Sequence, residues 1–314
     1  MANVGISSKP SYKLLEEKWS EFVGSEYSVT CNSGTSALHL GLLALGVQAG
    51  DEVIVPDFTM AACAFAVSYC GATPVFADVD VNNFSIIPYE IERLITPKTK
   101  AIMVVHVYGR LAPMEEILKI ARKYSLPVIE DACEAQGAVY QSRADITVYS
   151  FYKNKIISAE EGGMLCTDVK EYAETANLLK NMAFTPEHDY THNRIGFNYR
   201  MPESQAWLAL ESLGQYDRNA TKRRLIEGWY DKILGGSKAR DAVWFYEYFN
   251  GEDKSVLRHL PTARHSFKPL SGLPMYGSEG LPNSTFISKN FILLPCEPSM
   301  TREEVESIAH QVFI

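Results

Sequence analysis

The chain has 314 residues, which is enough for one large domain and a smaller one, each with its own buried core. Its composition is that of a globular enzyme, and its net charge of -8 argues against nucleic-acid binding as the main function. No apolar run approaches the roughly 20 residues of a membrane span, and no N-terminal signal pattern is present, so we expect a cytoplasmic protein without a membrane partner. The cysteines form no C-x-x-C pair and are expected to stay reduced.

The first half of the chain alternates short apolar runs with helical patterns. Such alternation is typical of an α/β fold, in which helices cover both faces of a mostly parallel sheet. The expected strands are 52–56, 74–80, 101–107, 127–131, 146–151 and 162–167, and the expected helices are 11–24, 34–46, 59–71 and 113–124.

The pattern changes after residue 168, where the strand signal becomes rare. Residues 183–200 are polar, aromatic and irregular, which is typical of a functional loop. Helices are expected at 171–182, at 202–234 with a bend near Gly214, and at 302–312, and a strand at 243–249. We therefore predict a large domain of residues 1–234 and a small α+β domain of residues 235–314.

Polar groups follow the carboxyl ends of the expected strands, where open parallel sheets bind ligands. Asp131 closes one strand, Ser150 closes the next, and a turn with Lys153 and Lys155 follows. Residues 33–36 begin a helix, whose free amides and dipole favour a phosphate. An amine, a carboxylate, a hydroxyl and an anion site are the groups that pyridoxal 5'-phosphate needs. Either lysine could form the Schiff base, and each group alone has an ordinary structural explanation.

Several separate blocks of the sequence agree with one known family in the same order. They are CNSGTSALHLGLLALGVQAGDEVIVP, GATPVFADVD, HVYGR, VIEDACEAQGA, SFYKNKIISAEEGGM, IGFNYRMPESQAWLAL and LPCEPSMTREEV. With these blocks the chain resembles the DegT/DnrJ/EryC1/StrS sugar aminotransferases, which are fold-type I pyridoxal-phosphate enzymes. The resemblance covers most of residues 25–215 and again 264–305.

The resemblance implies roles for individual residues. Lys155, rather than Lys153, matches the Schiff-base lysine, and Asp131 matches the carboxylate paired with the pyridine nitrogen. Related 3-dehydratases have a histidine in place of this lysine, so Lys155 favours transamination. The other implied contacts are Gly34, Thr35 and Ser150 on the phosphate, Glu134 near the ring hydroxyl, and Asn198 on the phosphate of the neighbouring subunit of a homodimer.

The sequence departs from the family pattern beside the cofactor. The family usually stacks an aromatic ring on the cofactor at the position of Met60. Either Met60 itself or Phe58, after a shift of the backbone, is expected to take this place. The N-terminal arm and the stretch between 235 and 264 are shorter than usual, which makes a non-catalytic homologue one alternative.

The stretch NMAFTPEHDYTHNRIGFNYRM resembles the loop of 4-aminotransferases that act on nucleotide-linked 4-keto-6-deoxyhexoses, the perosamine and viosamine synthase branch. We therefore expect a nucleotide-sugar substrate, glutamate as amino donor, and substrate contacts from His192, Arg264 and Phe267. A 3-aminotransferase or a dehydratase on the same fold is a further alternative. His188 and His192 are spaced like a metal pair, but no third ligand is evident, so no metal site is expected.

Overall fold

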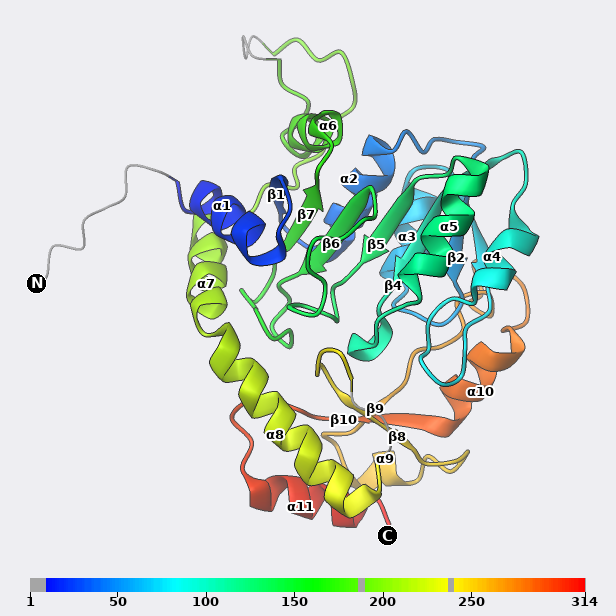
Figure 1. Cartoon of the computed structure of the whole chain (residues 1–314), viewed down its shortest axis with the longest axis vertical. Helices are drawn as coiled ribbons and strands as arrows, with labels where there is room; N and C mark the ends of the chain where they lie inside the picture. The colour runs from blue at the N-terminus through cyan, green and yellow to red at the C-terminus, as the bar shows by residue number, and fades with distance from the viewer. Residues whose placement is uncertain (1–9, 186–189, 237–239, 314) are drawn as a thin grey trace, which may run out of the picture.

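The computed structural model describes residues 10–185, 190–236 and 240–313. Its centre is a seven-stranded sheet in the spatial order β1-β7-β6-β5-β4-β2-β3 (Figure 1). The strands are β1 (Tyr27–Cys31), β2 (Glu52–Pro56), β3 (Thr73–Ala77), β4 (Thr99–Val105), β5 (Val128–Asp131), β6 (Ile146–Ser150) and β7 (Gly163–Thr167). Neighbouring strands are parallel except at β7, which runs antiparallel to both β1 and β6. The mostly parallel sheet is confirmed, although the sequence does not predict β1.

The reversal at β7 determines where the lysine turn lies. Residues 151–162 connect β6 to β7 without a helix. A chain that returns directly pairs antiparallel, because parallel neighbours need a crossover that is usually helical. The turn that carries Lys155 therefore leaves from the carboxyl end of β6, beside the carboxyl end of β5.

Helices cover both faces of the sheet. In β2, Val53 and Val55 pack in the cluster of α2, α3 and α6, whereas Ile54 packs against α4 and α5 on the other face. Helices α1 and α7 cover this second face near β6 and β7. The bounds are α1 (Ser11–Val23), α2 (Gly34–Ala44), α3 (Ala62–Tyr69), α4 (Pro88–Leu94), α5 (Met114–Tyr124), α6 (Lys170–Lys180) and α7 (Glu203–Gly214), with a short 3-10 turn at Val107–Gly109. The predicted α/β/α architecture is confirmed.

A smaller unit with a three-stranded antiparallel sheet, ordered β8-β10-β9, lies at the carboxyl side of the large sheet (Figure 1). Its elements are α8 (Tyr216–Leu234), β8 (Tyr246–Phe249), α9 (Val256–His259), β9 (Arg264–His265), α10 (Pro282–Asn290), β10 (Phe291–Leu294) and α11 (Arg302–Gln311). β8 begins three residues after the expected start at 243, and the sequence does not predict β9 or β10.

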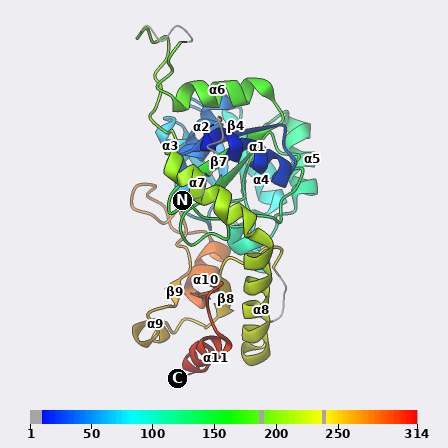
Figure 2. The same ribbon diagram turned by 90° about the vertical axis from the view of Figure 1, so that its left-hand side faces the viewer.

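Helix α8 packs with the smaller unit. The apolar cluster of β10 and α11 also contains Ile226 and Tyr230 of α8, and Figure 2 shows α8 beside α11. The single helix expected at 202–234 is two helices, α7 and α8, which are separated at Gln215, next to the bend expected near Gly214. The boundary at residue 234 remains a prediction, and this packing favours a boundary near Gln215.

Buried ion pairs connect the two units. Glu247 of β8 pairs with Arg240 at 2.5 Å and with Arg110, which follows β4 in the large unit. Arg240 also pairs with Glu227 of α8 at 2.8 Å. Because removing one partner would leave a buried charge uncompensated, this network ties the small unit to the large one.

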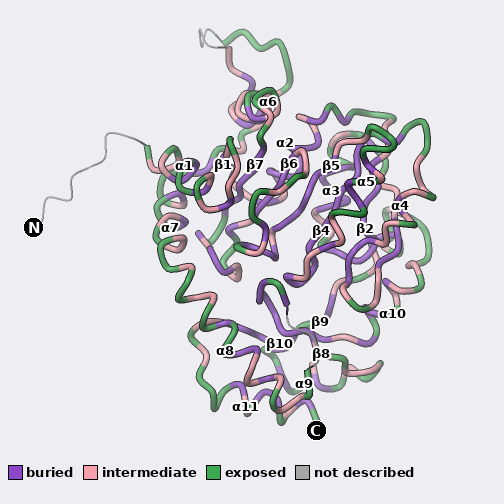
Figure 3. Tube along the Cα trace, in the orientation of Figure 1, coloured by how far each residue is buried: buried purple, intermediate pink, exposed green. Residues whose placement is uncertain are grey.

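Burial is concentrated along the strands of the large sheet (Figure 3). Their side chains, with the inner sides of the helices, form the main apolar clusters. Within residues 10–185, 190–236 and 240–313, no helix combines the length and the hydropathy needed to cross a membrane.

Candidate active site

A cavity of about 440 Å³ opens at the carboxyl ends of β5 and β6. Its walls come from the start of α2, the segment after β2, the lysine turn and the small unit. This edge is where open parallel sheets bind ligands. The expected site residues that line it are Gly34, Thr35, Met60, Asp131, Glu134, Ser150, Lys155, Arg264 and Phe267.

The N-terminus of α2 forms an anion site in this cavity. Ser33 caps the helix, since its side chain accepts a hydrogen bond from the Ser36 amide while the Ser36 side chain accepts one from the Ser33 amide. This capping box leaves the amides of Gly34 and Thr35 without a partner in the described part of the chain. Free amides at a helix start, together with the helix dipole, favour a phosphate group.

Asp131 presents a fixed carboxylate at the end of β5. Its Oδ1 accepts the amide of Cys133 at 2.9 Å, and its Oδ2 accepts the thiol of Cys63 at 3.3 Å. The side chain is buried, yet it lines the cavity. The carboxylate can therefore face a cationic ring nitrogen from a held position.

The structure separates the two lysines of the turn. Lys155 lines the cavity, and its Nζ lies 3.7 Å from the ring centroid of Trp244. Lys153 is exposed, does not line the cavity, and places its Nζ 5.9 Å from the ring centroid of Tyr152. Of the two amines, the one implied by the family resemblance is the one that reaches the site.

The profile of the DegT/DnrJ/EryC1/StrS aminotransferase family matches residues 2–313. The chain belongs to this family. A GDP-perosamine synthase from Caulobacter vibrioides is 36% identical over 322 residues, which cover 94% of this chain and 87% of the relative. A dTDP-3-amino-3,6-dideoxy-alpha-D-galactopyranose transaminase from Aneurinibacillus thermoaerophilus is 35% identical over 324 residues, which cover 95% of this chain and 88% of the relative.

Solved structures agree with this assignment. The aminotransferase PseC of Helicobacter pylori matches with a TM-score of 0.90 at 27% identity, over 98% of this chain and 91% of PseC. NtdA of Bacillus subtilis, solved with bound cofactor PMP, matches with a TM-score of 0.87 at 29% identity, over 98% of this chain and 77% of NtdA. The fold-type I assignment is confirmed, and the protein is a pyridoxal-phosphate-dependent sugar aminotransferase.

The residues of this aminotransferase fit the cofactor. A Cβ added to Gly34 would lie 2.9 Å from Cβ and 3.3 Å from Oγ of Ser150, so this small space admits no side chain. Two free amides and the Ser150 hydroxyl border the same space. A phosphate needs such a set of donors on a backbone that it can approach closely. Lys155 and Asp131 lie in the same cavity, as the amine and ring-nitrogen partners require.

Glu134 is a carboxyl group of this cavity whose pKa is strongly raised. Burial is the main reason that its pKa is raised to about 7; the charge of Asp131 contributes to the rise, whereas Lys155 and the amide of Tyr108 oppose it. That amide donates to Oε2 of Glu134 at 2.7 Å. Among the described residues the second oxygen, Oε1, has no hydrogen-bond partner, so it can carry a proton toward the cavity, which suits a partner of the ring hydroxyl.

The structure places the two candidates for the cofactor ring face differently, and the role of Met60 remains a prediction. Met60 lines the cavity and is 54% exposed. Phe58 is wrong as the alternative, because its ring is fully buried against Tyr108 and Phe267. The backbone of Phe58 is also bridged to Pro269 of the small unit, which keeps this ring pointing into the core.

His192 and Asn198 lie outside the cavity of their own chain. Both are exposed, and Nδ1 of His192 lies 2.9 Å from the carbonyl oxygen of Met182. Their expected roles remain predictions, and that of Asn198 concerns a neighbouring subunit. His188 lies outside the described residues.

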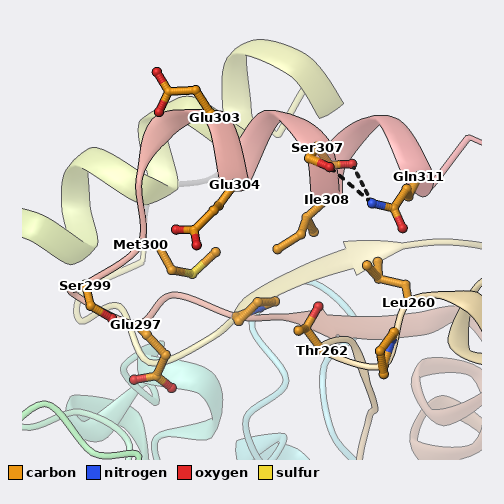
Figure 4. A pocket seen from close by; sticks show the side chains of 12 residues that line it. Leu260, Thr262, Glu297, Ser299, Met300, Glu303, Glu304, Ser307, Ile308 and Gln311 are labelled. Carbon is orange, nitrogen blue, oxygen red and sulfur yellow. Dashed lines mark hydrogen bonds between the residues drawn. The ribbon is translucent and has the colours of Figure 1, made fainter.

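A second cavity of about 850 Å³ lies in the small unit beneath α11 (Figure 4). Its described lining includes Glu297, Glu303 and Glu304 and contains no lysine, arginine or histidine. A phosphate would meet carboxylates there without a cation. The cavity at the large sheet therefore fits the cofactor better than this second cavity does.

Trp244 and Asn154 also line the active cavity, although the sequence does not single them out. The run VWFYEYF indicates only a strand, and its first residues precede β8 instead of belonging to it. The many aromatic residues in this run were the one sequence feature that could have indicated a role beside the cavity. Their position beside Lys155 depends on how the small unit packs, which no local pattern encodes.

Proposed function

We propose that the protein transfers an amino group from glutamate to the C4 ketone of a nucleotide-linked 4-keto-6-deoxyhexose. The observation that carries this proposal is the placing of Lys155 and Asp131 in one cavity with the anion site of α2. Within the sugar aminotransferases, 4-amination is supported by the similarity to GDP-perosamine synthases.

The proposed roles follow from the chemistry of each side chain. Pyridoxal phosphate, when bound, supplies an electron-withdrawing ring and an aldehyde carbon for the transferred nitrogen. Lys155 would hold the cofactor through its amine and would accept and return a proton as general base and acid. Asp131 stabilises the protonated ring nitrogen. Glu134, about half protonated near pH 7, donates a hydrogen bond to the ring oxygen.

A group of basic side chains supports a nucleotide-linked substrate. Arg264 and His265 line the small-unit wall of the cavity. Burial lowers the pKa of His265, and the charges of Lys268 and Lys254 lower it further. Mutual repulsion of this kind is relieved by a bound anion. In a chain of net charge -8, this cluster is suited to the diphosphate of a nucleotide sugar.

A homodimer with a shared active site is part of the proposal. Asn198 is exposed and its backbone is bridged to Asn181, so the side chain can serve a neighbouring subunit. Large apolar side chains are exposed nearby in the sequence, with Ile195 84% and Trp207 60% exposed. Such exposure supports an interface, because large apolar side chains gain free energy when a partner covers them.

The second candidate is amination at C3 of a related nucleotide sugar. The similarity to the 3-amino-sugar transaminase of Aneurinibacillus thermoaerophilus favours it. Incubation with 3-keto and 4-keto nucleotide sugars, followed by product identification by mass spectrometry and NMR, separates the two. Product from the 4-keto sugar alone is the expected result.

The first test is the visible absorbance of the purified protein, before and after glutamate is added. We expect a band of the lysine-bound cofactor that shifts to shorter wavelength with glutamate. Lys155→Ala should lose this band and turnover while keeping its fold, and Lys153→Ala is the matched control that should keep both. Unchanged turnover in Lys155→Ala contradicts the proposal. A wild-type protein that remains colourless with added pyridoxal phosphate favours a non-catalytic homologue.

A further inference from the structure

The amine of Lys155 lies against the indole of Trp244. The distance of 3.7 Å between Nζ and the ring centroid is that of a close cation–π contact. The indole is 8% exposed, and a cation on an aromatic face is held more strongly in such a desolvated place. Lys153, two residues earlier, is exposed and lacks a comparable contact at this distance.

A buried arginine of α8 fixes this indole to the lysine turn. Nη1 of Arg223 donates to the carbonyl oxygen of Trp244 at 2.6 Å, and Nη2 donates to that of Asn154 at 3.0 Å. Asn154 directly precedes Lys155, and its Oδ1 accepts the indole Nε1 at 3.4 Å. Arg223 is 1% exposed, so its position is set by these partners. One guanidinium therefore sets the spacing between the lysine turn and the indole.

We propose that Trp244 is a positioning residue, whose indole holds the amine of Lys155 whenever this lysine is not bonded to the cofactor. Arg223 keeps the indole in place. The inference rests on the role proposed above for Lys155. A released lysine has a flexible four-carbon side chain. A fixed aromatic face keeps its amine beside the reacting atoms, which reduces the entropy lost when the amine returns.

The test measures the acetylation of Lys155 relative to Lys153 in the full-length, cofactor-free protein, by peptide mass spectrometry. Trp244→Leu should raise this ratio about five- to thirtyfold, the factor that corresponds to a cation–π contact of about 1–2 kcal/mol. Trp244→Phe retains an aromatic face and should raise it only about twofold. Equal ratios in the Leu and Phe variants mean that the indole merely blocks access, and they overturn the proposal.

Arg223→Lys should raise the ratio as well, because a single ammonium lacks the planar fork that binds both carbonyl groups. Arg218→Met is the matched control, since Arg218 is an exposed arginine of the same helix. Its ratio should equal that of the wild type. A wild-type ratio in both Trp244→Leu and Arg223→Lys overturns the proposal.

A kinetic readout separates positioning from binding. In the cofactor-loaded enzyme, Trp244→Leu should lower kcat and leave KM for the amino donor nearly unchanged. A higher KM with an unchanged kcat assigns the indole to substrate binding and overturns the proposal. The labelling assay contains neither substrate nor cofactor. A negative labelling result therefore contradicts the role of Trp244 and leaves the role of Lys155 untouched, whereas unchanged turnover in Lys155→Ala contradicts the proposed function and leaves the labelling result untouched.

Discussion

Glu134→Gln should remove a specific dependence of stability on pH. Burial raises the pKa of Glu134 from 4.5 to about 7 in the folded protein. The folded state then binds the proton more tightly than the unfolded state does. The stabilisation is complete below pH 4.5 and is lost as the pH rises toward 7. A shift of this size corresponds to about 3 kcal/mol, at about 1.4 kcal/mol for each pKa unit.

The measurement is urea unfolding of the cofactor-free protein, with wild type and Glu134→Gln compared at several values between pH 4.5 and 7.5. Glutamine can still accept the Tyr108 amide, so the variant removes the titration but retains an acceptor. The quantity to compare is the difference in unfolding free energy between wild type and Glu134→Gln at each pH. Burial lowers the pKa of His39 to about 4, which makes stability rise with pH in both proteins and cancels in the difference.

The wild type should lose about 3 kcal/mol of unfolding free energy relative to Glu134→Gln across this range. Glu161→Gln is the matched control, because Glu161 lines the same cavity but is exposed. Its curve should run parallel to that of the wild type. If the unfolding free energies of wild type and Glu134→Gln change with pH in parallel, within about 1 kcal/mol, the pKa of Glu134 is not raised in the folded protein.

Other variants test the anion site at the start of α2, the apolar core and the ion pairs between the two units. Gly34→Ala forces its Cβ against Ser150 and should weaken pyridoxal-phosphate binding at least about tenfold, as measured by absorbance titration, at a strain of about 1–3 kcal/mol. Trp19→Ala removes a fully buried ring and should lower the free energy of unfolding by about 3–5 kcal/mol in urea. Glu247→Gln removes the buried carboxylate that Arg110 and Arg240 share, although Arg240 keeps its pair with Glu227, and should cost about 3–5 kcal/mol in the same assay.

Those site residues that belong to local motifs could be placed from the sequence. Gly34 begins a helix, Asp131 ends a strand, and Lys155 occupies the next turn, so their positions follow from chain order and from the rule for parallel sheets. The choice of Lys155 over Lys153 needed the family resemblance. The structure agrees with that choice because only Lys155 lines the cavity.

Positions set by long-range packing could not be predicted from the sequence. The loop after β2 illustrates this, because Asp57 accepts amides of Ser271 and Leu281 from the small unit. That contact fixes Phe58 in the core and leaves Met60 beside the cavity. The short strands β1, β9 and β10 depend on their partners in the same way, since strand preference reflects packing more than backbone propensity.

Two consecutive carboxylates in β5 show why a side chain's face decides its role. Successive residues of a strand point to opposite faces, so Glu130 and Asp131 cannot serve the same site. Glu130 is held by His106 at 2.8 Å and by Thr147 at 2.9 Å. Nδ1 of His106 accepts the amide of Ala112, so Nε2 carries the proton that is donated to Glu130.

These hydrogen bonds outweigh burial and lower the pKa of Glu130, which keeps it ionised and fully occupied within the protein. Asp131 has only an amide and a weak thiol donor among its described partners, and it faces the cavity. The carboxylate with spare accepting capacity is therefore the one at the ligand side. The same criterion applies to the amines, where Lys155 has an aromatic face beside the cavity and Lys153 faces solvent. Function in this aminotransferase follows from which polar groups the fold leaves partly unsatisfied at the carboxyl edge of the sheet.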